Sequence, residues 1–469
     1  MLIISSGIEV PLSHDLYDEV VSKLTRTLFT YNGEKIKLEV FIRKPDKIII
    51  PRFYEFDSEV IVDGTEKPLY IDITSSISLR DRQKKYSDVL KDINYGIIKA
   101  EPGFGKTVLS IHEICRCKLK TLIILNKTPL INGWKKEFIS KTNIDESDIG
   151  VLKTKDLTQF DKPIILATIQ CLMYGIKNED FLYKLQNSGI GLVFFDECHN
   201  TIGPEQFSKV SLSIKAKRIF GVSATPIRSD MADIVNLHLG DTIYFEEDEN
   251  DCRPKPIIYM IYVSFGIWKL YKNPKYYFMF NGRFQYTRYE KAMIKSKSYL
   301  NIVSNIIRRS YFKGNKKILV LGKITQPILE LIKTTKLDKS SVGIAIPTST
   351  KEERLLYSDT CDLDTAFFNR DVVFSTFKYA RDGNNRVDFD CLVQFCICSN
   401  IEQAVGRIQR DNPGKEPFVF DFIDTDIPPL NSLEIGYMIK QSEKRLNEYL
   451  QRGWEVKKVY LDENGNYKK

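Results

Sequence analysis

Short runs of consecutive apolar residues, separated by segments with helical spacing, recur along most of this chain. Up to about Tyr244 these runs are YGIIKA, TLIILN, PIILAT, GLVFFDE and RIFGVSA. A second series follows, with KKILVLG, VGIAI, DVVFST, CLVQFCIC and PFVFDFI. Such runs, spaced by helices, are typical of parallel strands that are buried on both faces. The pattern therefore predicts two consecutive α/β domains, joined by the acidic stretch FEEDENDCRPKP.

The first 78 residues follow another pattern and predict a small α/β unit. Apolar residues at helical spacing predict a helix over Asp15–Phe29. The turn signal Asn32-Gly33 is followed by two strand-like runs, KIKLEVFI and KIIIPRFY. Four basic residues lie near these strands: Arg43, Lys44, Lys47 and Arg52. They make this unit a candidate DNA-binding domain, with a simple structural cap as the alternative.

These patterns divide the chain into four parts. We predict an N-terminal accessory domain (1–78), a first α/β domain (79–248), a second α/β domain (249–430) and a helical C-terminal tail (431–469). The length of 469 residues and the apolar share of 43% fit several domains with cores of their own. No stretch approaches the roughly 20 apolar residues of a membrane helix, and the N-terminus has no signal-peptide pattern. We therefore expect a cytoplasmic, soluble monomer.

Charge and cysteine content narrow the function only slightly. The net charge of +8, from 69 basic and 61 acidic residues, favours a polyanionic partner without requiring one. Nine scattered cysteines, an odd number, argue against a disulfide framework. The close pairs are C-x-C rather than C-x-x-C, and the chain has only four histidines. No zinc site is therefore expected.

A glycine-containing loop, AEPGFGKT, lies between the strand-like run YGIIK and the helical segment VLSIHEICRC. Gly103 and Gly105 allow backbone N–H groups to approach phosphates, and the following helix N-terminus adds positive partial charge. Lys106 is placed to reach the β- and γ-phosphates of ATP, and Thr107 to ligate Mg²⁺. Ala100 stands at the first position, where a strict Walker pattern has glycine. A chance glycine loop is the alternative interpretation.

Two carboxylates follow the apolar run GLVFF at the end of a predicted buried strand. Asp196 would hold Mg²⁺, and Glu197 would orient and deprotonate the attacking water. An ordinary acidic pair at a strand end is the alternative, and the nearby phosphate loop makes it much weaker.

In order along the chain, these segments resemble the motifs of superfamily 2 helicases with a DECH box. LRDRQ, AEPGFGKT, DECH, GVSATPIRSD and QAVGRIQR match the motifs in turn, from about Leu79 to Asp424. The resemblance implies two RecA-like domains. It implies that the nucleotide is bound by Arg80, Gln83, Pro102, Gly103, Phe104, Gly105, Lys106, Thr107 and Val108, with Gln83 contacting adenine. It also implies a coupling role for His199, Ser223, Ala224 and Thr225.

The last of these motifs, QAVGRIQR, supplies basic groups from the second α/β domain. Gln403, Arg407 and Arg410 recur at helical spacing, so one helix face would carry them. Arginines of this kind stabilise the charge of a phosphoryl transition state. The resemblance therefore adds Gln403, Arg407 and Arg410 to Lys106, Asp196 and Glu197 as catalytic residues. Two solvated helix arginines are the alternative.

Weaker motif matches and one basic segment are candidates for contacting nucleic acid. The resemblance places a strand against Lys127, Thr168, Gln170, Lys323 and Thr376, mainly through phosphates. Residues 268–300 interleave aromatic residues with Lys and Arg, a composition that can stack on bases and pair with phosphates. The alternative, which we favour, is that Tyr277, Phe278, Phe280 and Phe284 pack as core.

The compact chain, its N-terminal unit and the short gap between LRDRQ and the phosphate loop are most similar to phage branch-migration helicases of the UvsW type and their large-DNA-virus relatives. That likeness implies an ATP- and Mg²⁺-dependent motor that remodels branched DNA in replication, recombination or repair, in the host cytoplasm if a phage encodes it. An RNA helicase or transcript-release factor is the first alternative. The others are a translocase subunit of a larger complex and an ATP-gated binding module without turnover. The presence of both Glu197 and the arginine pair argues against the binding module, because binding alone needs neither.

Overall fold

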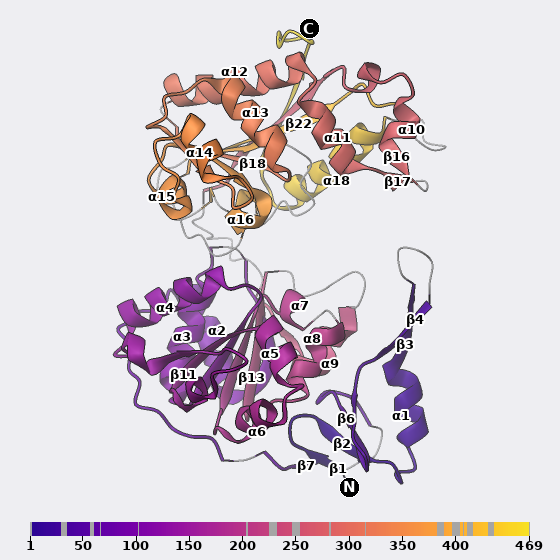
Figure 1. Cartoon of the computed structure of the whole chain (residues 1–469), viewed down its shortest axis with the longest axis vertical. Coiled ribbons are helices and arrows are strands. Elements are labelled where there is room, and N and C mark those ends of the chain that lie inside the picture. The colour runs from indigo at the N-terminus through magenta and orange to yellow at the C-terminus, as the bar shows by residue number, and fades with distance from the viewer. Residues whose placement is uncertain are drawn as a thin grey trace. The chain divides into compact units, whose positions relative to one another are not determined.

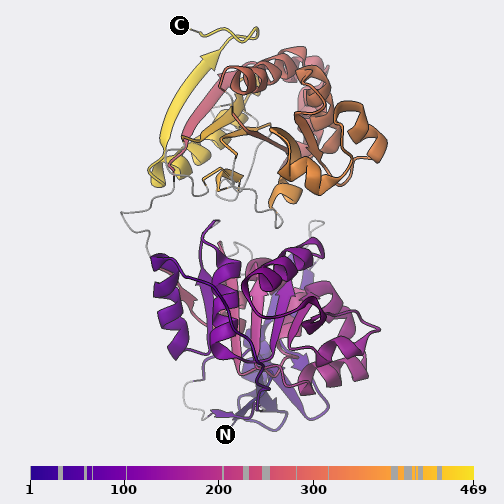
Figure 2. The same cartoon turned by 90° about the vertical axis from the view of Figure 1, so that its left-hand side faces the viewer.

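The chain forms two compact units, Met1–Glu247 and Asp248–Lys469, in a computed structural model (Figures 1 and 2). The structure describes residues 2–29, 35–56, 61–65, 67–101, 103–202, 205–224, 232–245, 254–280, 283–314, 316–381, 389–395, 404–406, 408–409, 416–429 and 436–468. Each unit is considered by itself below.

The first unit is built on a seven-stranded sheet in the order β10-β11-β9-β12-β13-β8-β14, whose strands all pair in parallel. Its strands are β8 (Tyr95–Lys99), β9 (Thr121–Leu125), β10 (Ile149–Val151), β11 (Ile164–Thr168), β12 (Leu192–Asp196), β13 (Arg218–Ser223) and β14 (Thr242–Ile243). The helices are α2 (Asp81–Asp92), α3 (Lys106–Cys117), α4 (Pro129–Lys141), α5 (Ile169–Gly175), α6 (Glu179–Asn187), α7 (Cys198–Thr201), α8 (Glu205–Ser211) and α9 (Ala232–Leu239), with 3-10 turns at Glu146–Asp148 and Leu157–Asp161.

Alternate residues of each central strand enter separate hydrophobic cores on the two faces of this sheet. In β12, for example, Val193 and Phe195 lie in one core, and Leu192 and Phe194 in the other. Burial on both faces explains why these strands are continuous apolar runs rather than alternating ones. The predicted α/β domain with a parallel sheet is confirmed.

The N-terminal residues form a five-stranded mixed sheet in the order β5-β6-β2-β1-β7. Its strands are β1 (Leu2–Ile4), β2 (Ile8–Pro11), β5 (Ile42–Arg43), β6 (Lys47–Ile50) and β7 (Ile61–Asp63); beside them are α1 (Tyr17–Leu24) and the hairpin β3 (Thr25–Phe29) with β4 (Lys35–Glu39). Leu2, Ile8, Val10 and Ile48 are buried in the same core as one face of the large sheet. The N-terminal elements are therefore packed into the first unit.

Arg52 connects this N-terminal sheet to the rest of the first unit by hydrogen bonds. Its buried guanidinium donates to the carbonyls of Ser5 and Ser6, to the Ile214 carbonyl at 3.2 Å and to the Tyr95 hydroxyl at 3.1 Å. Its inclusion among the candidate DNA-binding residues is therefore wrong, because a side chain that is 6% exposed and engaged in this way cannot reach a polymer.

The other basic residues near these strands lie closer to the surface. Lys47 forms an ion pair with Glu9, and Arg43 forms one with Glu39. Lys44 is exposed. They stay candidates for a polymer contact.

The second unit repeats the parallel arrangement in the order β19-β20-β18-β21-β22-β15-β23. Its strands are β15 (Ile257–Val263), β18 (Ile318–Gly322), β19 (Val342–Ala345), β20 (Val372–Thr376), β21 (Cys391–Gln394), β22 (Phe418–Asp424) and β23 (Glu455–Leu461), with a hairpin of β16 (Met279–Phe280) and β17 (Arg283–Phe284). The helices are α10 (Pro274–Phe278), α11 (Tyr286–Met293), α12 (Lys297–Phe312), α13 (Thr325–Thr335), α14 (Lys351–Tyr357), α15 (Leu363–Phe368), α16 (Phe377–Arg381) and α18 (Tyr437–Gln451), with a 3-10 turn at Trp268–Leu270.

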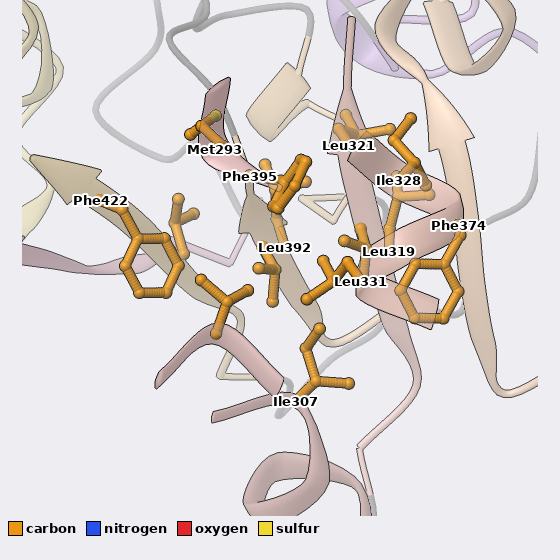
Figure 3. Close-up of a cluster of buried hydrophobic side chains, with 14 of the residues drawn as sticks. Met293, Ile307, Leu319, Leu321, Ile328, Leu331, Phe374, Leu392, Phe395 and Phe422 are labelled. Carbon is orange, nitrogen blue, oxygen red and sulfur yellow. The ribbon is translucent and has the colours of Figure 1, made fainter. Parts of the chain in front are cut away.

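One hydrophobic core joins the strands of the second unit to its helices. Leu319 and Leu321 of β18 lie with Leu392 of β21 and with Ile328 and Leu331 of α13 (Figure 3). The second predicted α/β domain is thus confirmed as well, and both sheets are of the RecA type.

Two sequence predictions differ from the observed elements. The predicted helix over Asp15–Phe29 ends at Leu24, because Thr25–Phe29 pairs with Lys35–Glu39 as a hairpin. The C-terminal tail, predicted to be helical, contains α18 but continues into β23, which pairs with β15 along its whole length. None of the helices in the described ranges has the length and apolarity that a membrane crossing requires.

Candidate nucleotide site

Three of the motif loops leave adjacent strands of the first unit at one edge of its sheet. β12, β13 and β8 are neighbours and run parallel, so their carboxyl ends meet. The phosphate loop follows β8, the Asp196–Glu197 pair closes β12, and Ser223 closes β13. Ligands of open parallel sheets bind outside the carboxyl ends of the strands. The fold thus brings together three motifs that are up to about 120 residues apart in sequence.

The phosphate loop has the backbone geometry that anion binding requires. Gly103 and Gly105 have φ angles of +83° and +84°, a region that residues with a Cβ rarely adopt. No atom of the residues that the structure describes lies within 4 Å of a Cβ placed on Gly103, so these residues leave the space above it open. Lys106 begins α3, and its Nζ donates to the carbonyls of Ala100 and Glu101 at 3.0 and 3.3 Å. The ammonium group is therefore held over the loop.

Helix α2 supports this loop from behind. The Gln83 amide donates to the Phe104 carbonyl at 3.0 Å and to the Gly105 carbonyl at 3.3 Å, and its oxygen accepts from the Arg80 backbone N–H. The Tyr86 hydroxyl donates to the Lys99 carbonyl at 2.6 Å, and its ring packs edge-on against Phe104. Gln83 is only 3% exposed and its amide is engaged by the loop. The structure therefore shows that Gln83 supports the phosphate loop, and its contact with adenine stays a prediction.

Asp196 lies half-buried at the tip of β12. The indole Nε1 of Trp134, in α4, donates to Asp196 Oδ2 at 3.1 Å. Burial and the neighbouring Glu197 carboxylate raise the pKa of Asp196 to about 6, although the Trp134 hydrogen bond and the Lys106 charge act in the opposite direction. A carboxylate in such a position is stabilised by a nearby cation.

Glu197 has a strained backbone and a carboxylate oxygen without a hydrogen bond. Its φ of +48° is left-handed, an uncommon conformation for a side chain of this size. Its Oε2 is buried, lies 3.5 Å from His199 Nδ1 and accepts no hydrogen bond within the described part of the chain. A buried carboxylate in this state suits a group that accepts a proton from a bound water.

A direct hydrogen bond joins the β12 and β13 motifs. His199 Nδ1 lies 2.8 Å from the Oγ of Ser223, which is fully buried. The Asn200 amide Nδ2 lies 2.9 Å from His199 Nε2 and donates to it, so Nδ1 carries the proton and donates to Ser223. The ring is therefore held in one tautomer between the acidic pair and the end of β13.

The residues at this edge fit ATP with Mg²⁺. The open space above Gly103, the left-handed glycines and the Lys106 ammonium suit a polyphosphate. Asp196 and Thr107, at the second position of α3, supply the oxygen ligands that Mg²⁺ prefers.

The candidate nucleic-acid residues of the first unit lie at the carboxyl ends of two neighbouring strands: Lys127 follows β9, Thr168 ends β11 and Gln170 lies in the first turn of α5. Gln170 Nε2 donates to the Asn126 carbonyl at 3.3 Å, which ties the loop after β11 to the loop that carries Lys127. Thr168 Oγ1 accepts from the Cys171 N–H and so caps α5. These residues therefore share one edge of the sheet.

In the second unit, Lys323 and Thr376 follow the neighbouring strands β18 and β20. Lys323 Nζ lies 4.0 Å from the buried Glu290 and 5.5 Å from the centre of the Tyr286 ring. Thr376 Oγ1 accepts from the Tyr379 N–H at 3.3 Å. The two residues lie close together, because Gly322, which precedes Lys323, pairs with Thr376. Such closeness is needed if both residues contact one nucleic-acid strand.

Several predicted residues lie outside the described residues: Pro102, Thr225, Gln403, Arg407 and Arg410. Of the others, Phe104 is 7% exposed and Ala224 is 3% exposed, so both serve in packing. Val108, in the first turn of α3, is half-buried.

Sequence reasoning missed Trp134, whose contact with Asp196 spans 62 residues. Its spacing from Ile131 and Phe138 on α4 predicts only a core residue, and no local signal marks the indole N–H as a partner of the acidic pair.

Comparison with known proteins shows similarity to helicases. The family model described as "Type III restriction enzyme, res subunit" matches residues 76–228. A protein of Acanthamoeba polyphaga mimivirus, assigned as an ATP-dependent RNA helicase, is 26% identical over 95% of this chain and 84% of its own length. A protein of invertebrate iridescent virus 6, assigned as a helicase, is 23% identical over 82% of this chain and 83% of its own length.

Further similarities cover less of the chain or concern the fold alone. The DNA 3'-5' helicase XPB of Mycobacterium tuberculosis is 27% identical over 36% of this chain and 30% of its own length. A fragment of an HsdR subunit of a type I restriction enzyme from Vibrio vulnificus matches the fold with a TM-score of 0.54 at 14% identity, over 84% of this chain and 71% of that one. In its motifs, its two RecA-type sheets and these relatives, the chain resembles superfamily 2 helicases, in particular those of phages and large DNA viruses.

Proposed function

We propose that this protein is a nucleic-acid-stimulated ATPase that remodels branched DNA, by unwinding forks, migrating junctions or annealing strands. The observation that carries the ATPase part is the meeting of the phosphate loop, the Asp196–Glu197 pair and Ser223 at the ends of three adjacent strands. Bound ATP and Mg²⁺ supply a phosphoryl group that water can attack.

The residues of the first unit have separate roles in this proposal. Lys106 binds the β- and γ-phosphates, and Thr107 and Asp196 hold Mg²⁺. Glu197 accepts the proton of the attacking water through its buried Oε2. His199 and Ser223, with Ala224 and Thr225, transmit the state of the site to β13. From the second unit, we assign stabilisation of the transition-state charge to Gln403, Arg407 and Arg410.

Branched DNA as the polymer rests on similarity and on the N-terminal elements. The motif residues Lys127, Thr168, Gln170, Lys323 and Thr376 would hold a strand through its phosphates, which both DNA and RNA carry. RNA is the second candidate, because the relative that covers 95% of this chain is assigned as an RNA helicase. DNA is favoured by the relatives named as DNA 3'-5' helicases.

A steady-state ATPase assay tests both parts. The purified chain is assayed alone and with single-stranded, duplex, forked and four-way-junction DNA and with RNA. We compare Glu197→Gln with Glu179→Gln, which changes an exposed glutamate at the start of α6 in the same unit. The proposal expects branched DNA to stimulate ATP turnover the most. Glu197→Gln should lose this turnover, and Glu179→Gln should keep it.

Each other result overturns a stated part of the proposal. Stimulation mainly by RNA would keep the ATPase and reject DNA as the polymer. Equal stimulation by linear and branched DNA would reject junction remodelling and favour the alternative of a translocase subunit of a larger complex. No turnover with any polymer would reject the enzyme and leave an ATP-gated binding protein.

A further inference from the structure

Residues 268–297 of the second unit carry a strong excess of positive charge. The segment contains Lys269, Lys272, Lys275, Arg283, Arg288, Lys291, Lys295 and Lys297, and its one acidic residue is Glu290. Glu290 is 3% exposed, so its charge lies beneath the surface. The 3-10 turn at Trp268–Leu270, α10, the β16–β17 hairpin and α11 form the segment, and Figure 1 shows α10, the hairpin and α11 side by side.

The aromatic residues of this segment divide into a buried and an exposed set. Phe278 and Phe284 are 0% and 7% exposed, as the favoured prediction of core packing requires, and Trp268 stacks on Phe278 with ring centroids 5.6 Å apart. Phe280, by contrast, is 49% exposed, so the core prediction is wrong for this residue. Tyr276 is 87% exposed on α10. The buried rings fix a small scaffold, and the exposed rings project from it.

A second row of rings beside these residues is already paired with cations. Tyr271 and Tyr277 are stacked with their centroids 4.2 Å apart. Lys295 Nζ lies 4.9 Å from the Tyr271 centroid, and the Arg288 guanidinium lies 5.9 Å from that of Tyr277. The Arg288 side chain also donates to the Tyr277 carbonyl at 3.0 Å. The surface beside Tyr276 is therefore cationic, and its rings are held by contacts within the segment.

The outermost lysines of the segment form no ion pair within the described part of the chain. Lys269, Lys272, Lys275 and Lys291 are exposed, and none of them forms an ion pair with another described residue. Solvated lysines alone need no explanation, but Lys272 and Lys275 lie close in sequence to the exposed ring of Tyr276. Exposed rings between unpaired cations match a ligand that offers both flat apolar faces and repeated negative charge.

We propose that this aromatic–basic platform (Lys269, Lys272, Lys275, Tyr276 and Phe280) binds single-stranded nucleic acid outside the helicase motifs. Tyr276 and Phe280 stack on unpaired bases, and the three lysines contact phosphates. A duplex hides the faces of its bases in the stack, so the rings select a single strand. The platform deepens the proposed function, since it adds to the motor a contact for a strand that has been separated from its partner.

Fluorescence anisotropy of the full chain without nucleotide tests this proposal. The probes are labelled oligo(dT), oligo(rU) and a blunt duplex of the same length. Tyr276→Ala is the first variant, because a residue 87% exposed can be changed without opening the core. Loss of one base–ring stack lowers affinity for the single strand by about 5- to 150-fold. The matched control is Tyr183→Ala, which removes a 67% exposed ring from α6 of the first unit.

The lysines are tested by the salt dependence of the same binding. Lys269→Gln/Lys272→Gln/Lys275→Gln should reduce the slope of log K against log salt by about 2, since each phosphate contact on a single strand contributes about 0.7. The control replaces three exposed lysines elsewhere in this unit, Lys313, Lys333 and Lys351, by Gln. A 4-thiothymidine oligonucleotide should also cross-link to the peptide that contains Tyr276 and Phe280.

Single-strand affinity and salt slope that equal those of wild type in both variants would overturn the proposal, as would cross-links confined to other peptides. A fall in duplex and single-strand affinity by the same factor would reject stacking. Equal losses with oligo(dT) and oligo(rU) support a platform that accepts either polymer, and a loss with only one assigns it to that polymer. Because binding is measured without ATP, a chain without ATPase activity can still show the platform, and an active ATPase can lack it.

Discussion

The hydrogen bond from Trp134 to Asp196 gives a sharp test of how the proposed Mg²⁺ site is held. Trp134→Phe keeps an aromatic ring beside Phe138 in the core but removes the indole N–H. Asp196 then loses the donor that fixes Oδ2, while Lys106 and Glu197 are unchanged. We expect the carboxylate to become less well oriented and its ionised form to become less favourable.

The expected magnitude follows from two independent ranges. A hydrogen bond to a charged group contributes about 1.5–3 kcal/mol. Loss of a partner that orients a metal ligand costs about 10- to 100-fold in metal affinity or activity, which is about 1.4–2.7 kcal/mol. The ranges agree, so Trp134→Phe should raise the Mg²⁺ concentration for half-maximal ATPase, or lower turnover, by about 10- to 100-fold.

The assay is a Mg²⁺ titration of ATPase activity at saturating ATP and polymer, with Mg²⁺-dependent binding of a fluorescent ADP as a second readout. Trp454→Phe is the matched control, because Trp454 is 7% exposed, close to the 5% of Trp134, but lies in the second unit. Thermal unfolding of each variant separates a positioning effect from lost stability. An unchanged Mg²⁺ dependence in a folded Trp134→Phe protein would refute the reasoning.

Three further predictions concern stability and are checked by denaturation of the full chain. Arg52→Ala should lower the free energy of unfolding by about 2–4 kcal/mol, because it leaves buried carbonyls unpaired. Lys44→Ala should change it by no more than about 0.5 kcal/mol. Equal effects would show that Arg52 does not stabilise the packing of the N-terminal sheet. Arg445→Ala should cost about 3–5 kcal/mol in the second unit, because it leaves Asp421 charged and buried without its bidentate partner; a loss below about 1 kcal/mol would contradict this. Burial lowers the pKa of His238 to about 3, so the unfolded chain binds a proton at this residue below about pH 6.5 and the folded chain does not. The free energy of unfolding should therefore be unaffected by His238 above about pH 6.5 and should fall by up to about 1.4 kcal/mol per pH unit as the pH is lowered toward 3. His238→Asn should reduce this dependence of unfolding free energy on pH, and an unchanged dependence would contradict the prediction.

The parallel sheets could be predicted because their strands carry a signal in every residue. Runs such as TLIIL and LVFFD are buried on both faces, so no polar position interrupts them. The motifs that follow these runs lie at strand ends, where a parallel sheet must bring them together. Adjacent strands thereby placed Lys106, Asp196 and Ser223 at one edge without any information on side-chain contacts.

The remaining features depend on partners that are distant in sequence. Strand β23 has four of its seven residues exposed and three charged residues among its first four, so its sequence has no buried-strand signal, and it pairs along the edge of β15. The hairpin strand Thr25–Phe29 continues an apolar spacing that also fits a helix, and pairing with Lys35–Glu39 decides between them. The buried position of Arg52 likewise depends on Ile214, 162 residues away.

The contacts around Glu197 form a short path within the first unit, along which the proposed hydrolysis could be coupled to movement. The left-handed backbone of Glu197 ends β12 and turns the chain at once into α7, which sets His199 against Ser223 on the neighbouring strand. Because Asn200 fixes the tautomer, His199 Nδ1 donates its proton to Ser223 Oγ, and Glu197 Oε2 lies 3.5 Å from the same nitrogen without accepting a hydrogen bond from a described residue. Protonation of Glu197 during hydrolysis would weaken its attraction for that proton and leave the bond to Ser223 as the stronger one. In the proposed function the same histidine would therefore transmit the protonation state of Glu197 to β13, and this is a physical reason for the two motifs to lie on adjacent strands.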